Sequence, residues 1–579
     1  MKTLVDKFIE LLASSKTKAT NIRKAAKELG WDEGALEKVA IMLELRGIVK
    51  VTYPVNPWES ISVQLLREEE IESERPLKEG KVYSQYQINV DGVKADVTVY
   101  FSEDEKSAKY NISMPSISPY TRIFIEGVKN EVIKEVPIEV EQITDIEKAR
   151  RIREDFHRNI LGVLDNYKLP QKEKEVLGGI LLHEMSGLGD LEMLIADDWL
   201  EEVIVNAAEI PVGVYHRKYG WLETNLHIRN EEMIADYSAY IGRKIGRNIS
   251  SLTPVLDAHL LTGDRVNATL YPVSTRGNTI TIRKFARNPW TITNFISPDL
   301  NTMSVDMAAL LWQAIQYEMN IIIAGGTASG KTTTLNCLAG LIQPYHRIIS
   351  IEDTREIMLP SYMWNWIPTV TRTPNPEGLG EVSMLELMVT SLRMRPDRII
   401  VGEIRRGKEA EVLFEAMHTG HSVYSTLHAD TGLQVIKRLV EPPISVPESE
   451  IHAINLLVVQ HRDRRLNLRR TMEISEVVPG PEGEPDLNVI YHWRPKTDNF
   501  ELIREPRRYV EVLNLHTGMT YAEMKEDIEN KKKILNYMVE KKVDQLDQVG
   551  ALMKMYYADP DYVLSGVKKN YSFKKIVGG

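Results

Sequence analysis

The sequence predicts an α/β fold that is divided into several domains. An apolar segment of buried type, Met319–Ala324, runs directly into a glycine-rich turn and then into a helical segment, Lys331–Ala339. Two further apolar segments, Arg347–Ile351 and Arg398–Val401, have the length and composition of strands in the same parallel sheet. With 579 residues the chain is too long for one core, and about 150 residues per domain suggests roughly four domains.

Composition narrows the class of protein. Apolar residues make up 43% and charged residues 27% of the chain, a typical balance for a globular protein. The net charge of −10 argues against general coating of nucleic acid. The one cysteine, Cys337, excludes internal disulfides and multi-cysteine zinc sites, and it suits a reducing cytoplasm. No stretch approaches the ~18 apolar residues that span a bilayer, so we expect any membrane role to be peripheral.

Residues 1–55 resemble a winged helix-turn-helix module. Helical patterns at the N-terminus, at Asn21–Leu29 with Thr20 as its cap, and at Glu33–Leu45 precede a strand pattern at Ile48–Tyr53. DNA binding and protein docking are the two interpretations of such a module. Docking is favoured because phosphates would be repelled by the acidic residues of the third helix, which outnumber Lys38 and Arg46: Asp32, Glu33, Glu37 and Glu44.

Residues 56–141 have the pattern of a small β-rich domain. Strands are expected at Val82–Val90, Ala95–Phe101 and Ala108–Met114, with a hairpin at Asp91-Gly92. Residues 142–189 are expected to be helical, and Pro170 should divide two helices.

Residues 190–290 are expected to form a mixed α/β domain, followed by a linker at 291–300. One helix is expected at Glu231–Arg247. The strands of this domain are expected at Val203–Val205, Val212–Tyr215, Trp221–Glu223, Arg265–Tyr271 and Asn278–Phe285.

An α/β domain that contains the glycine-rich turn is expected at 301–445, and a mixed extension at 446–579. The extension contains a charged helical segment, Glu523–Lys541. Its basic end is either a solvated terminus, the favoured interpretation, or a contact for anionic lipid or a partner; it consists of Lys568, Lys569, Lys574 and Lys575.

The glycine-rich turn matches the phosphate-loop pattern G-x-x-x-x-G-K-[ST] in full. Glycines allow the backbone to curl with its N–H groups pointing at an anion, and the following helix directs its positive end to the same place. We expect Lys331 to reach the β- and γ-phosphates of ATP, and the Thr332 hydroxyl to coordinate Mg²⁺. The complete expected loop is Gly325, Gly326, Thr327, Ala328, Ser329, Gly330, Lys331, Thr332 and Thr333.

Acidic residues follow the next two expected strands. Glu352 comes directly after Arg347–Ile351, and Glu403 follows Arg398–Val401 after one glycine. The carboxyl ends of parallel strands are where such sheets hold their ligands. Either glutamate can orient the attacking water while the other helps to hold hydrated Mg²⁺.

Three histidines lie in the segment MHTGHSVYSTLHAD: His418, His421 and His428. A metal site is one interpretation, but an expected strand separates the first two from the third, and no pair is spaced i,i+4. A polar sensor for the γ-phosphate is the favoured interpretation.

Taken together, these segments resemble the secretion ATPase superfamily of type II and type IV secretion, type IV pili and archaeal flagella. Four blocks stand in the family's order: GGTASGKTT, IISIEDTREIML, LRMRPDRIIVGEIR and AMHTGHSVYSTLHA. The resemblance covers about residues 190–445. It implies that Glu352 and Glu403 are acidic catalytic groups and that His428 contacts the nucleotide. It also implies that Arg265 and Arg283 bring guanidinium groups to the phosphates, with Arg393 and Arg395 as further candidates.

The resemblance further implies a RecA-like core, a preceding PAS-like domain and nucleotide bound between two lobes. Six copies would form a ring at the cytoplasmic face of the membrane, beneath a polytopic platform protein, and would act indirectly on prepilin-like subunits. The four-cysteine zinc module of many bacterial relatives cannot exist here, and Arg462–Glu476 resembles archaeal relatives. We therefore expect an ATP-driven assembly motor of archaeal type. The alternatives are a DNA-binding or DNA-translocating ATPase and a nucleotide-dependent scaffold.

Overall fold

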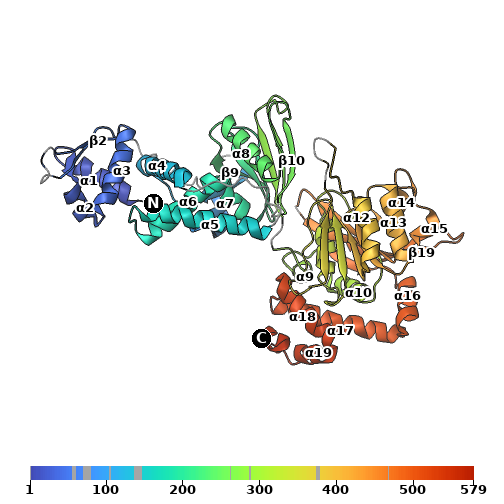
Figure 1. Ribbon diagram of the computed structural model, residues 1–579. Coiled ribbons are helices and arrows are strands. Elements are labelled where there is room, and N and C mark those ends of the chain that lie inside the picture. The colour runs from blue at the N-terminus through green and yellow to red at the C-terminus, as the bar shows by residue number, and fades with distance from the viewer. Residues whose placement is uncertain are drawn as a thin grey trace. The chain divides into compact units, whose positions relative to one another are not determined.

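The computed structural model describes residues 2–54, 56, 60–68, 80–102, 106–135, 146–260, 263–285, 288–372, 374, 378–466 and 468–578. The chain divides into two compact units, Met1–Phe285 and Ala286–Gly579 (Figure 1). Within the described residues, no helix has both the length and the apolar character that crossing a bilayer requires.

The first unit begins with a winged-helix arrangement. Three helices and three short strands follow one another as α1 (Leu4–Ser14), β1 (Ala19–Asn21), α2 (Ile22–Leu29), α3 (Glu33–Leu45), β2 (Val49–Thr52) and β3 (Ser62–Leu65). The strands form an antiparallel sheet in the order β1-β3-β2. The expected cap of α2 is wrong by one residue: the Asn21 side chain, not that of Thr20, accepts the amides of Arg23 and Lys24.

Three longer helices share the core of the winged-helix module. They are α4 (Pro119–Glu135), α5 (Ile146–Asp165) and α6 (Gln171–Ser186). Pro170 precedes the first residue of α6, as expected, because a ring without an N–H is tolerated at a helix start. One flank of α3 lies against α4: Arg46 pairs with Glu126 at 2.5 Å, and Met42 contacts Gly127.

A nine-stranded sheet forms the rest of the first unit, in the order β10-β11-β12-β7-β8-β9-β6-β5-β4. Asp91 and Gly92 have φ values of 50° and 86°, which suit the tight β4–β5 hairpin that the sequence predicts. The strands are β4 (Gly80–Val90), β5 (Val93–Ser102), β6 (Ser107–Ser113), β7 (Leu200–Val205), β8 (Pro211–His216), β9 (Gly220–His227), β10 (Val255–His259), β11 (Arg265–Thr269) and β12 (Thr279–Arg283).

Parallel pairing of β6 with β9 joins the expected segments 56–141 and 190–290 into this one sheet. Helices α7 (Leu191–Ala196) and α8 (Glu231–Lys244) pack their apolar residues against it. Helix α8 ends three residues before the expected end, and β10 has no counterpart among the expected strands.

The second unit is built on a mixed sheet in the order β15-β14-β16-β17-β13-β18-β19-β20-β21. The first six of these run parallel, and the last three continue the sheet antiparallel. The strands are β13 (Ile321–Gly325), β14 (Ile348–Glu352), β15 (Trp366–Val370), β16 (Arg398–Val401), β17 (Ser422–Leu427), β18 (Leu456–Asp463), β19 (Leu468–Pro479), β20 (Pro485–Arg494) and β21 (Asn499–Leu502).

Two apolar cores contain the residues of the two faces of this sheet. One includes α9 (Ile292–Ile296), α10 (Val305–Gln316), α11 (Lys331–Ala339) and the C-terminal helices. The other includes α12 (Met384–Ser391), α13 (Gly407–His418), α14 (Gly432–Val440) and α15 (Glu448–Ile451). A 3₁₀ turn, Leu392–Met394, directly follows α12 in the chain. The expected linker 291–300 thus contains a helix, because Ile292, Phe295 and Ile296 are buried in the first core.

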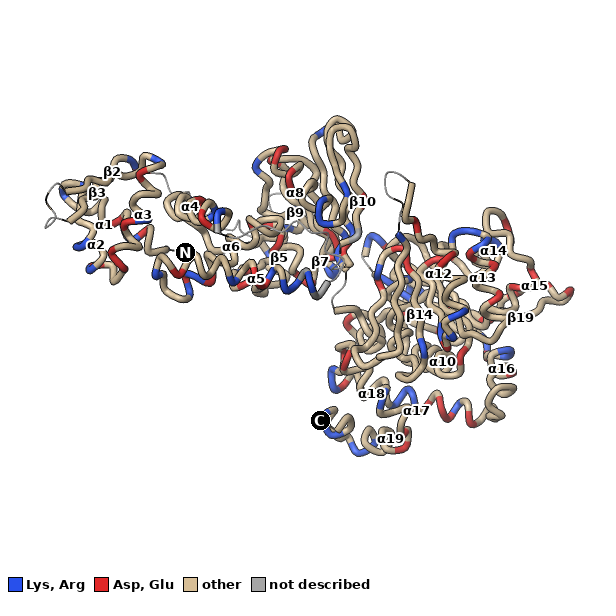
Figure 2. Tube along the Cα trace, in the orientation of Figure 1, with Lys and Arg blue, Asp and Glu red and all other residues tan. Residues whose placement is uncertain are grey.

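The C-terminal helices extend this unit well past residue 445. They are α16 (Arg508–Thr517), α17 (Tyr521–Glu540), α18 (Leu546–Ala558), α19 (Pro560–Lys568) and α20 (Phe573–Val577). The charged helix α17 agrees with the expected segment, although its Lys531 is fully buried and paired with Asp527 at 2.6 Å. All four lysines of the basic end are exposed, and Figure 2 shows the distribution of charged residues.

Candidate nucleotide-binding and catalytic site

A curled loop joins strand β13 to helix α11 at the carboxyl edge of the second sheet. Every residue of β13 is buried, and parallel neighbours β17 and β18 flank it. Gly325 and Gly330 have φ values of 153° and 97°, in the region that favours glycine. A Cβ at Gly325 would lie 2.4 Å from the Ser329 hydroxyl oxygen, so a side chain there would fill the curl.

The residues of this curl fit a polyphosphate. The Ser329 hydroxyl is buried and has no hydrogen-bond partner among the described residues. Thr332 and Thr333 are half-buried in the first turn of α11, where backbone N–H groups have no helical acceptor. The cradle, the unpaired hydroxyl and the helix end together supply donors suited to anionic oxygens.

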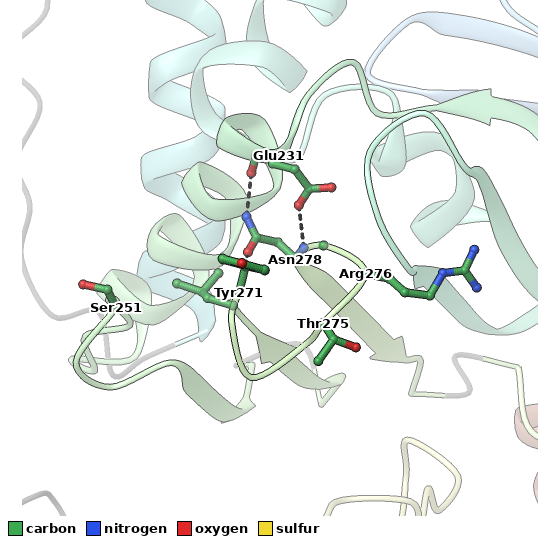
Figure 3. Close-up of a pocket in the computed structure, with 8 residues that line it drawn as sticks. Glu231, Ser251, Tyr271, Thr275, Arg276 and Asn278 are labelled. Atoms are coloured by element: carbon green, nitrogen blue, oxygen red, sulfur yellow. Dashed lines mark hydrogen bonds between the residues drawn. The ribbon is translucent and has the colours of Figure 1, made fainter.

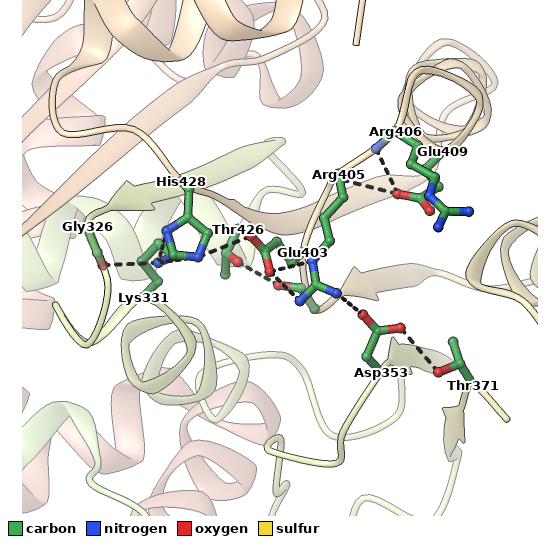
Figure 4. A network of polar contacts seen from close by, with 11 residues as sticks. Gly326, Lys331, Asp353, Thr371, Glu403, Arg405, Arg406, Glu409, Thr426 and His428 are labelled. Atoms are coloured by element: carbon green, nitrogen blue, oxygen red, sulfur yellow. Dashed lines mark hydrogen bonds and ion pairs between the residues drawn. The ribbon is translucent and has the colours of Figure 1, made fainter. Parts of the chain in front are cut away.

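Lys331 links the loop to the end of strand β17. Its Nζ donates to the Gly326 carbonyl at 3.1 Å and to Nδ1 of His428 at 3.2 Å, although the two residues are 97 positions apart. His428 Nε2 in turn lies 3.2 Å from a carboxylate oxygen of Glu403 (Figure 4). Burial and the Lys331 charge lower the pKa of His428, so a neutral ring accepts from the lysine and donates to the glutamate.

The network continues from Glu403 to strand β14. Arg405 donates to Glu403 at 2.7 and 2.9 Å and reaches Asp353 at 2.5 Å. Thr371 donates to the other carboxylate oxygen of Asp353 at 3.1 Å. Side chains from β14, β16 and β17 thus meet at one edge because these parallel strands all end there (Figure 4).

Glu352 occupies a different environment from Glu403. It is only 2% exposed, and one carboxylate oxygen accepts the amides of Glu356 and Ile357 at 2.8 and 3.0 Å. The second oxygen is buried and has no hydrogen-bond partner among the described residues. Burial raises the pKa of Glu352 to about 7, against those two amide hydrogen bonds, which lower it. A carboxyl poised near neutral pH suits proton transfer or a water-bridged cation.

Arg265 and Arg283 lie opposite each other on β11 and β12 in the first unit. Arg265 makes two hydrogen bonds to Asp257, at 2.9 and 3.2 Å, and Arg283 is also opposite Glu202 of β7. Their role toward phosphates therefore stays a prediction from the resemblance.

The loop between β11 and β12 lines a pocket in the same unit. The side chain of Asn278, at the end of this loop, accepts the Tyr271 amide at 2.8 Å and donates to the Glu231 carbonyl at 2.8 Å (Figure 3). The Asn278 backbone also donates to the Glu231 carboxylate. These bonds fix the turn that connects the two arginine-bearing strands.

His418 and His421 lie apart from the nucleotide-binding loop. They precede β17, whereas His428 follows it, so the length of the strand separates them. His418 lies 2.5 Å from Glu450, and His421 contacts Thr419. Among the described residues, no three histidine, cysteine, aspartate or glutamate side chains form a group that could hold a metal.

Arg393 and Arg395 precede β16 and are exposed, at the opposite end of that strand from Glu403. No local sequence pattern predicts a role for Arg405 or Asp353. The sequence feature that could have pointed to Arg405 is its position two residues after Glu403. For Asp353 it is the position directly after Glu352.

Comparisons with known proteins identify relatives of this chain. A family profile described as "Type II/IV secretion system protein" matches residues 194–494. An uncharacterized protein of Methanocaldococcus jannaschii is 35% identical over 415 residues, 70% of this chain and 74% of the relative. The type IV secretion system protein PtlH of Bordetella pertussis is 31% identical over 245 residues, 39% of this chain and 72% of the relative.

Among solved structures, the ATPase DotB of Legionella pneumophila aligns with 20% identity over 64% of this chain and 92% of its own, with a TM-score of 0.36. The family assignment depends on the profile and on the M. jannaschii relative. The profile match and this relative show that the chain belongs to the type II/IV secretion ATPase family, whose characteristic phosphate loop, acidic strand ends and histidine lie here at one sheet edge.

Proposed function

We propose that this protein hydrolyses ATP with Mg²⁺ and uses the reaction to drive motion in a ring of six copies that powers assembly of a pilus-like, archaeal-flagellum-like or secretion filament. The observation that carries the proposal is the chain of contacts Lys331–His428–Glu403, which connects the phosphate loop to the acidic strand ends. A network from the loop to the acidic residues at the strand ends is what a nucleotide-driven switch requires.

The loop residues Gly325–Gly330 would hold the polyphosphate through backbone N–H groups, and Lys331 would add the main positive charge. The Thr332 hydroxyl would hold Mg²⁺, and Glu403 would hold it through water. When bound, the cation supplies charge neutralisation at the phosphate oxygens. Glu352 has the environment of a proton acceptor and Glu403 that of an ion-paired carboxylate, so we propose Glu352 as the residue that orients and deprotonates the attacking water.

His428 gives this site a means to respond to its ligand. In the structure Lys331 donates to His428, and a phosphate group would compete for the same ammonium. Release of His428 from Lys331 would change its contact with Glu403. We propose that this exchange reports the γ-phosphate to Glu403 at the end of β16 and that Arg265 and Arg283 complete the charge neutralisation.

Family membership supports the proposed partners. We propose that the ring works at the cytoplasmic face of the membrane, under a polytopic platform protein, and acts indirectly on prepilin-like subunits. No zinc is part of this proposal.

The test is phosphate release by the purified chain and by Glu403→Gln, together with sedimentation of both. We expect magnesium-dependent release from the wild type, a decrease of about 100-fold or more in the variant, and six-fold assembly with nucleotide. A wild type without magnesium-dependent turnover would leave only a nucleotide-dependent scaffold.

The winged-helix arrangement is the one observation that favours a DNA-binding ATPase as a second function. The structure limits that function because α4 covers one flank of α3 and the cation Arg46 is paired with Glu126. Filter binding of duplex DNA at low and moderate salt distinguishes the DNA-binding ATPase from the filament-assembly motor. Tight binding that weakens steeply with salt would support the DNA function.

A further inference from the structure

The hairpin of β18 and β19 extends past the sheet edge at which the phosphate loop begins. Gln460 is the last residue of β18 that pairs with β13, opposite Gly325, and β18 continues for three more residues. At about 3.3 Å per residue, the hairpin projects roughly 10 Å beyond that pair. A β-bulge between Val459 and Gln460 marks the point where it leaves the core, and bulges at such places redirect side chains.

This hairpin is strongly basic. Between residues 462 and 469 the sequence has four arginines against one aspartate: Arg462, Arg464, Arg465, Asp463 and Arg469. A cationic projection beside a phosphate loop raises the local concentration of anionic ligands.

The base of the hairpin is held rigidly. Arg470 is 5% exposed and makes two hydrogen bonds to Asp498, at 2.7 and 2.8 Å, and one to the Leu300 carbonyl at 2.9 Å. The Thr471 amide donates to the Thr302 carbonyl at 2.7 Å. Adjacent residues of a strand point to opposite faces, so anchoring Arg470 directs Arg469 away from Asp498.

Arg469 lies along the phosphate loop itself. Its Nε donates to the Ala328 carbonyl at 3.2 Å, and its Cδ is 3.7 Å from the position that a Cβ would take on Gly330. Ala328 has a φ of 58°, an unusual value for a residue with a side chain, and the Arg469 hydrogen bond holds this peptide. The two terminal nitrogens of Arg469 have no hydrogen bond to any other described residue.

We propose that Arg469 is a polyphosphate-binding residue, contributed by the β18–β19 hairpin, that both fixes Ala328 and donates from its terminal nitrogens to a phosphate oxygen. This inference depends on the proposed nucleotide function and adds a residue outside the four sequence blocks. A guanidinium has five donors in one plane, so one N–H can hold the loop while the others bind the anion.

The experiment is calorimetric titration of ADP with Mg²⁺, at several salt concentrations, into the wild type, Arg469→Ala, Arg469→Lys and a control, Arg465→Ala. The control removes one charge from the hairpin at a side chain that is 88% exposed and paired only locally, with Asp463. Thermal unfolding without nucleotide checks that every variant is folded.

We expect Arg469→Ala to weaken ADP binding by about 10- to 100-fold and to flatten its salt dependence. Arg469→Lys should recover part of the affinity, since it keeps the charge. The control should stay within about 2-fold of the wild type, because exposed ion pairs contribute little.

Two results would overturn the inference. One is wild-type affinity in Arg469→Ala. The other is an equal loss in the alanine and lysine variants with the salt dependence unchanged, which would mean that Arg469 only shapes the loop. A wild type that binds no ADP would instead refute the proposed function, and this inference with it.

Discussion

Glu352 offers a quantitative prediction about pH and stability. Its carboxyl is 2% exposed and its pKa is raised to about 7 from an ordinary value of 4.5. The substitution Glu352→Gln removes this titration, keeps an oxygen to accept the amides of Glu356 and Ile357, and changes the volume little.

The direction in which stability changes with pH follows from proton linkage. Because the folded-state pKa lies above the unfolded-state value, the folded protein retains the proton between pH 4.5 and 7 while the unfolded chain loses it, so Glu352 lowers stability increasingly as pH rises through this window. Each unit of difference corresponds to about 1.4 kcal/mol, which gives a penalty of under about 1 kcal/mol at pH 5 and about 3 kcal/mol at pH 8. Relative to Glu352→Gln, the wild type should therefore lose about 2.5 kcal/mol between these pH values.

Hydrogen exchange of peptides from β14, followed by mass spectrometry, measures this difference. Comparing the two proteins at the same pH cancels the intrinsic dependence of exchange on pH. We expect the ratio of their opening constants to change by about 70-fold between pH 5 and pH 8, with the wild type becoming the less protected. A ratio that stays constant would mean that Glu352 is ionised at both pH values and would refute its assignment as the proton acceptor.

Three further substitutions test other parts of the site. Gly325→Ala places a Cβ 2.4 Å from the buried Ser329 hydroxyl, so we expect the variant to lose at least about 2 kcal/mol in unfolding free energy and to bind no ADP. The control Gly420→Ala, at positive φ in open space, should lose only about 1 kcal/mol in unfolding free energy and still bind ADP. His428→Ala should lower single-turnover hydrolysis about 10- to 100-fold with a smaller change in ADP affinity; equal losses in both would make it a binding residue only. Arg283→Ala should lower turnover about 1000-fold with less than a 10-fold change in affinity, and unchanged turnover would remove it from the catalytic set.

Local sequence patterns predicted the nucleotide-binding core closely. The bounds of α11 and β16 agree with the expected segments residue for residue, and β13 and β14 agree to within two residues. Apolar strands and a glycine-rich turn are defined by neighbouring residues, so periodicity and composition are sufficient to find them.

Contacts between distant segments were not predictable in the same way. The Lys331–His428 contact and the Arg405–Asp353 pair join residues 97 and 52 positions apart, and no local pattern encodes such a distance. The same limit explains the pairing of β6 with β9, which joins segments expected as separate domains. Helix α17 is rich in charged residues, yet Lys531 is buried, where Asp527, one turn earlier, pairs with it.

The most direct test of the central claim is calorimetric titration of ADP with Mg²⁺ into the wild type and Lys331→Ala. Lys331 supplies the ammonium of the phosphate loop and the first contact of the network that leads to Glu403. We predict saturable binding at one site per chain in the wild type and no detectable binding heat in the variant. Equal affinity in the two proteins, or no heat from the folded wild type, would contradict the account.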